Sequence, residues 1–302
     1  MEEEEEEEEE EGIELVLDKY RKAGRILAEI REGAIARVKE GALLLEVAEF
    51  VENSTREKGG EPAFPCNISL NEEAAHATPS IDDETVFGNE LVKIDIGVHI
   101  DGYIGDSAVT VDLSGEHEDL VRASEAALSE AIKIIRDGVS TVEIGEVIEN
   151  VIRGRGYRPV VNLSGHGLAR YNSHALPTIP NVRYERGVIL TENDVVAIEP
   201  FVTDGAGKVV EGGTVEIYGL IKAKPVRVNE AKKLLEEIEK YRGLPFAKRW
   251  LPRERLDLAL RTLKTVGALR EYPVLREEEK GFISQAEHTV IVTKDGCEVT
   301  TK

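Results

Sequence analysis

The chain has 302 residues, of which 32% are charged, and its formal net charge at pH 7 is -21. This negative charge disfavours binding to the phosphate backbone of nucleic acids. No apolar stretch is long enough to span a membrane, and the start lacks the basic and apolar regions of a secretion signal, so we expect a cytoplasmic protein that needs neither membrane nor nucleic acid. Two cysteines do not make a disulfide framework.

Residues 1–11 form an acidic tail, in which Glu2 to Glu11 supply ten of the 21 net negative charges. Like charges repel and glutamate offers no apolar surface to bury, so we expect this tail to be disordered and residues 12–302 to fold. A solvated tail without a specific function is the simpler interpretation. Contact with a basic surface, such as one at the ribosome, is the alternative.

Two amphipathic helices are predicted next, the first from Ile13 to about Gly41 and the second from Ala42 to Glu57. Further along, Ser114 can cap a helix that runs to Asp137, and Thr141 can cap one that ends near Gly154 or Gly156. Predicted strands occupy about 92–99, 103–112, 195–203, 208–223 and 282–293. Helices and strands therefore alternate in two rounds, which predicts an α+β fold with helices covering one face of a curved sheet.

The first strand pair is predicted to be a hairpin that turns at Asp101 and Gly102, a favourable two-residue turn. With this turn, Gly97 pairs with Asp106 and Asp95 pairs with Ala108. Because side chains alternate between the faces of a strand, Asp95 and Asp106 then lie diagonally on one face. Two carboxylates in apolar surroundings repel each other and need a cation or a shared proton, so this pair predicts half of a two-metal site.

Three more possible ligands follow in apolar surroundings. His166 stands between two glycines, and Glu199 and Glu287 each lie inside a hydrophobic run of strand type. A glutamate in a buried strand is costly unless it is paired, protonated or bound to metal. Four carboxylates and one imidazole suit divalent manganese, iron, cobalt or zinc.

Residues 225–275 are predicted to be a helical insertion, with helices over Asn229–Tyr241 and Arg253–Val266. Several basic residues in this segment, such as Lys248 and Arg249, would also suit a winged-helix DNA reader. Solvated helix faces explain them more simply.

The ordered set Asp95, Asp106, His166, Glu199 and Glu287 resembles the five-ligand signature of the pita-bread metallopeptidases. The surrounding motifs resemble type II methionine aminopeptidases of archaeal style over nearly all of residues 12–302. These motifs are Phe64-Pro65, Asn71 to His76, Lys93 to Gly102, Gly165-His166-Gly167 with His174, Ala197 to Phe201 and Gln285 to Thr289. The resemblance implies a pita-bread fold, a pseudo-symmetric curved antiparallel sheet covered by helices, in which residues 12–302 form the catalytic domain and 225–275 the helical insertion.

The resemblance also implies an enzyme that removes the initiator methionine from nascent proteins and prefers a small second residue. Two divalent ions (cobalt, manganese, iron or zinc), bridged by Asp106 and Glu287, would activate a hydroxide for attack on the peptide bond. Asp95 would bind one ion, and His166 with Glu199 the other. The implied catalytic residues are His76, His174 and Glu199, and the implied substrate pocket comprises Phe64, Ile68, Tyr272, His76 and His174.

Alternatives remain at this point. A Xaa-Pro aminopeptidase or dipeptidase would share the fold and the five ligands, but such relatives usually carry a separate N-terminal domain. A non-catalytic pita-bread binding protein would share the fold but has typically lost ligands. We expect the nascent polypeptide to be the partner, contact with the ribosome to be an option, and the protein to be a monomer.

Overall fold

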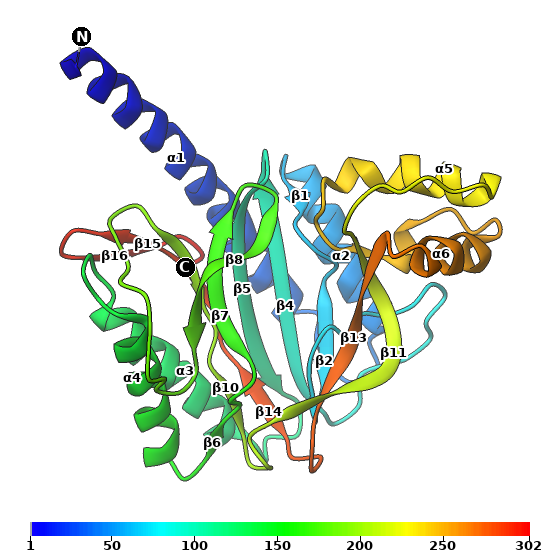
Figure 1. The fold of residues 1–302 in the computed structure, drawn as a ribbon. Coiled ribbons are helices and arrows are strands. Elements are labelled where there is room, and N and C mark those ends of the chain that lie inside the picture. Colours follow the sequence, from blue (N-terminus) through cyan, green and yellow to red (C-terminus); the bar gives the residue numbers. More distant parts are fainter. Residues whose placement is uncertain (1) are drawn as a thin grey trace.

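The computed structural model describes the backbone of residues 2–302 and the side chains of residues 12–302. Figure 1 shows curved sheets in the middle of the molecule, with helices packed against them and the first helix projecting at one corner. The helices are α1 (Glu2–Ile35), α2 (Leu44–Glu57), α3 (Glu118–Ile134), α4 (Thr141–Gly154), α5 (Asn229–Ile238) and α6 (Leu256–Thr265), with short 3-10 turns η1 (Glu239–Tyr241) and η2 (Lys248–Trp250). Among the described residues, no helix is long and apolar enough to cross a membrane.

The strands of the first half are β1 (Glu61–Pro62), β2 (Asn67–Leu70), β3 (Glu73–Ala75), β4 (Leu91–Ile100), β5 (Tyr103–Asp112), β6 (Arg158–Pro159), β7 (Ser164–Ala169) and β8 (Asn172–Pro180). Those of the second half are β9 (Val195–Ile198), β10 (Phe201–Thr203), β11 (Val209–Leu220), β12 (Phe246–Ala247), β13 (Leu269–Glu277), β14 (Ile283–Gln285), β15 (His288–Thr293) and β16 (Gly296–Val299). The pairings between these strands are antiparallel.

The first helix pair covers the sheet in the order β1-β4-β2, in which β5 also pairs with β4. Apolar residues of α1 and α2, such as Leu27 and Val47, pack in one core cluster with Ile94 and Ile96 of β4. The predicted hairpin register is confirmed, because Gly97 pairs with Asp106 and Ile100 with Tyr103.

The second helix pair, α3 and α4, covers strands from the other half. Buried residues of these helices, such as Leu128 and Ile148, share a core cluster with Val196 of β9, Val202 of β10 and Val290 of β15. The helix pairs thus repeat the same plan on two parts of the curved sheet, as Figure 1 shows. The predicted α+β plan is confirmed.

Helices α5 and α6 lie beside each other at the right of Figure 1, on the other side of the sheets from α3 and α4. They pack in a core cluster of their own, in which Leu234 and Leu263 meet Phe246 of β12 and Leu269 of β13. These strands pair with β11 in the order β12-β11-β13-β3. The segment therefore packs against the sheet that carries Ile217 and Tyr272, which line the cavity described below. The division of the chain into a tail, a catalytic domain and an insertion stays a prediction.

Several predicted helix boundaries are wrong. Helix α1 runs from Glu2 to Ile35 and not from Ile13 to about Gly41. Helix α3 begins at Glu118 and not near Ser114, because Asp112 accepts hydrogen bonds from the amides of Ser114, Gly115 and His117 and holds this stretch in a loop. Helix α4 is capped by Ser140, one residue before Thr141, in a capping box with Glu143.

Candidate active site

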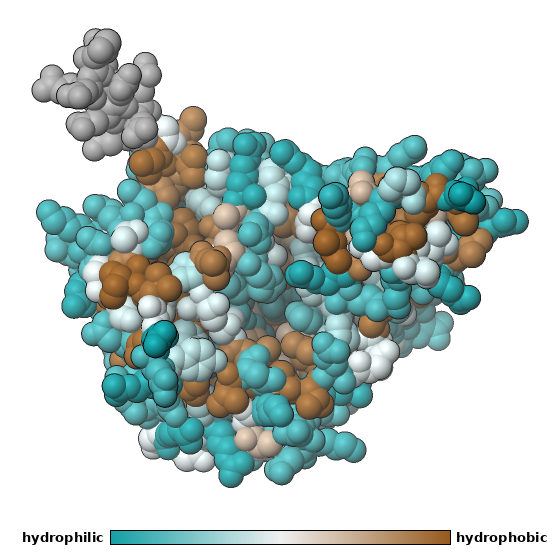
Figure 2. All heavy atoms as spheres, in the orientation of Figure 1, coloured by the Kyte–Doolittle hydropathy of each residue, from teal (hydrophilic) through white to brown (hydrophobic). Residues whose placement is uncertain are grey.

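A cavity of about 230 Å³ opens between the sheets and the β11-β13 side of the molecule. Figure 2 shows a recess with apolar side chains on this face, between hydrophilic surfaces. Most of the residues predicted from the sequence line the cavity: Phe64, His76, Asp95, Asp106, His166, His174, Glu199, Tyr272 and Glu287. Segments that are far apart in the chain therefore meet at one place.

The hairpin presents Asp95 and Asp106 to the cavity from one face, as the register requires. Asp106 is 3% exposed. Its backbone amide donates to Thr289 Oγ1 at 2.8 Å, and Thr289 Oγ1 donates to the carbonyl of Asp106 at 2.8 Å. These bonds fix the backbone at Asp106 and leave its carboxylate free to face the cavity.

Glu199 and Glu287 occupy breaks in the strands rather than strand interiors. Glu199 lies between β9 and β10, and Glu287 lies between β14 and β15. The amide of Glu287 donates to the carbonyl of Ala108 at 3.0 Å, and Ser107 Oγ donates to the carbonyl of Glu287 at 2.7 Å. Each glutamate thus leaves the regular pleat where the chain passes from one sheet to another, and its side chain enters the cavity.

His166 completes the cluster from β7, where flanking glycines allow a close approach of the neighbouring strands. A Cβ added at Gly167 would lie 2.1 Å from the carbonyl oxygen of Leu176, so no larger residue fits there. His166 Nε2 is 3.4 Å from Glu199 Oε1 and 3.9 Å from Asp106 Oδ2. Ligand atoms of Asp106, His166 and Glu287 lie within 4.8 Å of one another, close enough to share a metal ion.

The electrostatics of this cluster call for a cation. Burial raises the pKa of Asp95 to about 7. Burial, and after it repulsion from the other carboxylates, raises the pKa values of Asp106, Glu199 and Glu287 well above the usual carboxyl range. Among the described residues, no lysine or arginine forms an ion pair with any of these four groups.

Unpaired oxygen atoms support the same conclusion. Asp95 Oδ1, Asp106 Oδ1 and Glu287 Oε2 are buried and have no hydrogen-bond partner in the described part of the chain. Burial also lowers the pKa of His166 to about 3, so its imidazole is neutral and able to bind a metal ion. Oxygen donors with one imidazole match a hard or borderline divalent cation. The donor set therefore fits the predicted metal centre.

His76 and His174 line the same cavity as this cluster. His76 has a φ of 64°, a left-handed conformation that non-glycine residues adopt rarely and often at functional sites. Its ring meets Tyr272 edge-on at 5.5 Å, and its Nδ1 is 3.2 Å from the carbonyl of Pro273. The ring of His174 lies 4.4 Å from that of His166. Both histidines thus border the space beside the carboxylates.

Ile68 does not line the cavity, which corrects the prediction made from the resemblance. Side chains alternate along β2, so Asn67 faces the cavity while Ile68 is 2% exposed and packs in the core against α1 and α2. Sequence reasoning missed Asn67, which pairs with Asp95 in the sheet, and Pro245. It also missed a role for Gln285, whose Nε2 is 3.5 Å from Glu199 Oε2. Gln285 is the only glutamine in the chain, a signal that could have drawn attention to it.

Gly97 leaves room for an aromatic wall of the cavity, because a Cβ at this position would lie 2.3 Å from Phe64 Cε1. We expect Gly97→Ala to push the Phe64 ring into the cavity and to lower kcat/KM at least about tenfold, with overpacking costing about 1–3 kcal/mol of stability. Peptide hydrolysis and thermal unfolding measure both effects. Gly213→Ala is the control, since no atom lies within 4 Å of its added Cβ. Equal activity in the two variants would contradict this account of the wall.

A fold of antiparallel sheets and covering helices, with a buried carboxylate and histidine cluster open to one cavity, fits the class of metal-dependent peptidases. The chain belongs to metallopeptidase family M24, whose profile matches residues 18–294. It is 49% identical over 288 residues to a methionine aminopeptidase of Methanocaldococcus jannaschii, an alignment that covers 94% of this chain and 98% of the relative. It is 50% identical over 289 residues to a methionine aminopeptidase of Archaeoglobus fulgidus, covering 95% and 99%.

Solved structures share the fold. The crystal structure of a methionine aminopeptidase from Thermotoga maritima superposes with a TM-score of 0.71 at 23% identity, covering 94% of this chain and 96% of that one. The predicted pita-bread fold is therefore confirmed.

Proposed function

We propose that this chain is a methionine aminopeptidase, which removes the initiator methionine from nascent proteins and prefers a small second residue. The observation that carries this function is the cavity in which Asp95, Asp106, His166, Glu199 and Glu287 converge beside an aromatic wall. The two relatives described above as methionine aminopeptidases align with nearly the whole chain at about half identity, which supports the same activity.

Two divalent ions are proposed as the cofactor, with cobalt, manganese, iron and zinc as the possible identities. Asp95, Asp106, His166, Glu199 and Glu287 would hold these ions. Bound divalent ions supply Lewis-acid chemistry, which polarises a scissile carbonyl and makes water nucleophilic near neutral pH.

The remaining steps belong to side chains of this chain. His174 donates a hydrogen bond to the scissile carbonyl oxygen as negative charge develops on it. Glu199 carries a proton toward the leaving amine. His76 contacts the substrate near its amino end, while Phe64 and Tyr272 form the apolar walls that receive the methionine side chain. The preference for a small second residue follows from the family resemblance.

The acidic composition and the substrate class fit a cytoplasmic enzyme that acts on nascent chains, with contact at the ribosome as an option. We propose a monomer that requires no nucleic acid. The net charge of -21 supports the absence of nucleic acid, because a strongly acidic surface repels the phosphate backbone.

A peptide panel tests the substrate class. Peptides beginning with Met-Ala, Met-Val, Met-Leu, Xaa-Pro and Leu-Ala are incubated with the purified protein and each of the four metals. We expect release of methionine from Met-Ala and Met-Val, and little cleavage of the others. Preferential cleavage of Xaa-Pro would instead indicate a proline-specific aminopeptidase, and cleavage of none would indicate a non-catalytic binding protein.

Removal of metal is expected to abolish activity. After treatment with a chelator and dialysis, the protein should release no methionine, because four adjacent carboxylates, two buried and two half-buried, lack another counter-charge in the described part of the chain. Added manganese, cobalt or iron should restore release. The assay measures free methionine before and after metal addition. Full activity in excess chelator would rule the metal mechanism out.

A further inference from the structure

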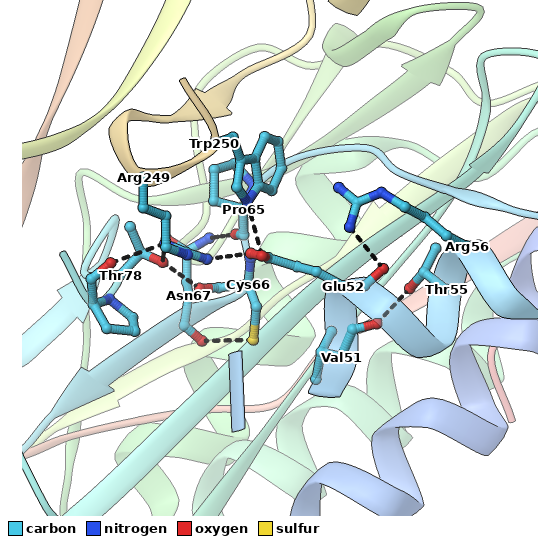
Figure 3. A network of polar contacts seen from close by, with 11 residues as sticks. Val51, Glu52, Thr55, Arg56, Pro65, Cys66, Asn67, Thr78, Arg249 and Trp250 are labelled. Atoms are coloured by element: carbon cyan, nitrogen blue, oxygen red, sulfur yellow. Dashed lines mark hydrogen bonds and ion pairs between the residues drawn. The ribbon is translucent and has the colours of Figure 1, made fainter. Parts of the chain in front are cut away.

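A buried polar network joins helix α2 to the 3-10 turn η2, outside the cavity (Figure 3). The carboxylate of Glu52 forms an ion pair with Arg249 and accepts a hydrogen bond from Trp250 Nε1 at 2.7 Å. It also accepts from the backbone amide of Cys66 at 3.2 Å. The side chains of Arg249 and Glu52 are only 4% and 5% exposed. Solvent therefore weakens these contacts little.

The guanidinium of Arg249 reaches a second segment at the same time. Its Nη1 donates to Thr78 Oγ1 at 2.8 Å and to the carbonyl of Pro79 at 2.9 Å. Thr78 Oγ1 in turn donates to the carbonyl of Cys66 at 2.7 Å. Both backbone polar groups of Cys66 are thus held by the network. A planar fork with several donors makes this possible, and a lysine ammonium does not have that geometry.

One wall of the cavity is attached to this network. Phe64 and Asn67 flank the Cys66 position and line the cavity. His76, which also lines it, precedes Thr78 by two residues. The amide of Ile68 donates to the carbonyl of Ala77 at 2.7 Å and joins the two segments. Displacement of Thr78 or Cys66 would therefore move Phe64 and Asn67, whereas the ring of His76 is held by its own contacts with Tyr272 and the carbonyl of Pro273.

A second group of lining residues is attached to the network through η2. Arg249 follows β12, in which Ala247 pairs with Ile217, and Ile217 pairs with Tyr272 of β13. Pro245, Ile217 and Tyr272 line the cavity. The network is thus a polar connection between these two groups of lining residues, which form two walls of the cavity.

Stability alone is a weak explanation for such a pair. Burial raises the pKa of Glu52 even though Arg249 opposes this shift, which shows how strongly lost hydration counts here. Well-packed apolar residues often stabilise a core as well as a buried ion pair does. Unlike apolar contacts, the hydrogen bonds of this network fix the relative position of the segments that they join, because each bond requires a particular distance and angle.

We infer that Glu52, Arg249 and Trp250 are positioning residues that set the spacing between the two walls of the methionine pocket. The inference rests on the proposed function. The network touches neither substrate nor metal ligands, so its loss weakens binding of the methionine side chain and leaves the chemical step in place. A loss of this kind raises KM with little change in kcat.

Arg249→Lys is the first test, because it keeps the positive charge beside Glu52 and loses the forked contacts to Thr78 and Pro79. Hydrolysis of a Met-Ala peptide and of a Leu-Ala peptide is measured on the metal-loaded enzyme. We expect KM for Met-Ala to rise at least fivefold, kcat to stay within twofold, and the preference for methionine over leucine to fall at least fivefold. Metal content should not change. An unchanged KM and preference, or a fall in kcat alone, would overturn the inference.

A double variant separates positioning from stability. Glu52→Gln with Arg249→Met removes both charges, so no buried charge is left without a partner and the thermal midpoint should lie near that of the wild type. The contacts to Thr78 and Pro79 are still missing. We expect the raised KM and the reduced preference to persist. If KM and the preference for methionine returned to wild-type values together with the thermal midpoint, the network would have a merely structural role.

Arg253→Lys is the matched control in the same part of the chain. Arg253 pairs with Asp82 at 2.9 Å, but their side chains are 66% and 71% exposed. KM, kcat and the preference for methionine of the Arg253→Lys variant should stay within twofold of the wild-type values. The wild-type assay separates the two proposals: without methionine release by wild type the proposed function fails, whereas release with an unaltered Arg249→Lys variant overturns only this inference.

Discussion

Asp106→Asn and Asp95→Asn are each expected to abolish tight binding of at least one divalent ion and nearly all methionine release. Each substitution removes a negative charge from the same hairpin face and replaces a strong oxygen ligand by a neutral amide. Because bound metal contributes several kcal/mol to lowering the barrier, kcat/KM should fall roughly 1,000-fold or more. Metal content by atomic spectroscopy and peptide hydrolysis measure the two effects, with circular dichroism to check folding.

Asp101→Asn is the matched control on the same hairpin. Asp101 lies in the turn, has a φ of 52° and pairs with Lys19 on the surface at 2.9 Å. Asparagine accepts this left-handed conformation before glycine readily. Activity should therefore change by less than about threefold, which corresponds to a change of less than about 0.7 kcal/mol in the activation free energy. If this variant were as damaging as Asp106→Asn while folded, the metal assignment would have to be abandoned.

His76→Ala is expected to lower kcat by a factor of order 100 or more while metal content stays near that of the wild type. Acid-base and hydrogen-bonding groups typically contribute this much. Burial lowers the pKa of His76, so the imidazole is neutral at pH 7. Its Nδ1 lies beside the carbonyl of Pro273, which leaves Nε2 available to the substrate.

The same assays on His117→Ala provide the comparison for His76. His117 stacks on Phe282 at 4.0 Å between ring centroids, does not line the cavity, and should retain activity within twofold. Loss of metal along with activity in His76→Ala would mean that His76 acts on the metal centre instead of the substrate.

The hairpin could be predicted from the sequence because its register depends on local chemistry. Asp101 and Gly102 favour one turn, and this turn alone places Asp95 and Asp106 on one face. The strand breaks at Glu199 and Glu287 were not predicted, since both runs are apolar on each side and nothing local marks the place where the chain changes sheets. The residue types of the proposed ligands could be predicted from the sequence, whereas the direction in which each side chain points required the tertiary structure.

The pocket walls were harder to predict than the ligands. Ile68 was expected in the pocket but lies in the core, because the face that a strand shows depends on the position of its neighbours as well as its own pattern. Glu52 and Arg249 are separated by 197 residues, and each has the appearance of a solvated helix charge in the sequence. Only the packing of η2 on α2 brings them together.

The backbone bonds around Asp106 have a consequence for how the molecule folds. The amide of Asp106 and Thr289 Oγ1 are 183 positions apart in the chain, and Ser107 is 180 positions from the carbonyl of Glu287 that it contacts. Contacts of such long range close a very large loop and form late. The active cluster therefore arises only after the early hairpin has docked on the last strands. Partial opening that separates these segments would dismantle the cluster even while each helix pair stays packed on its own strands.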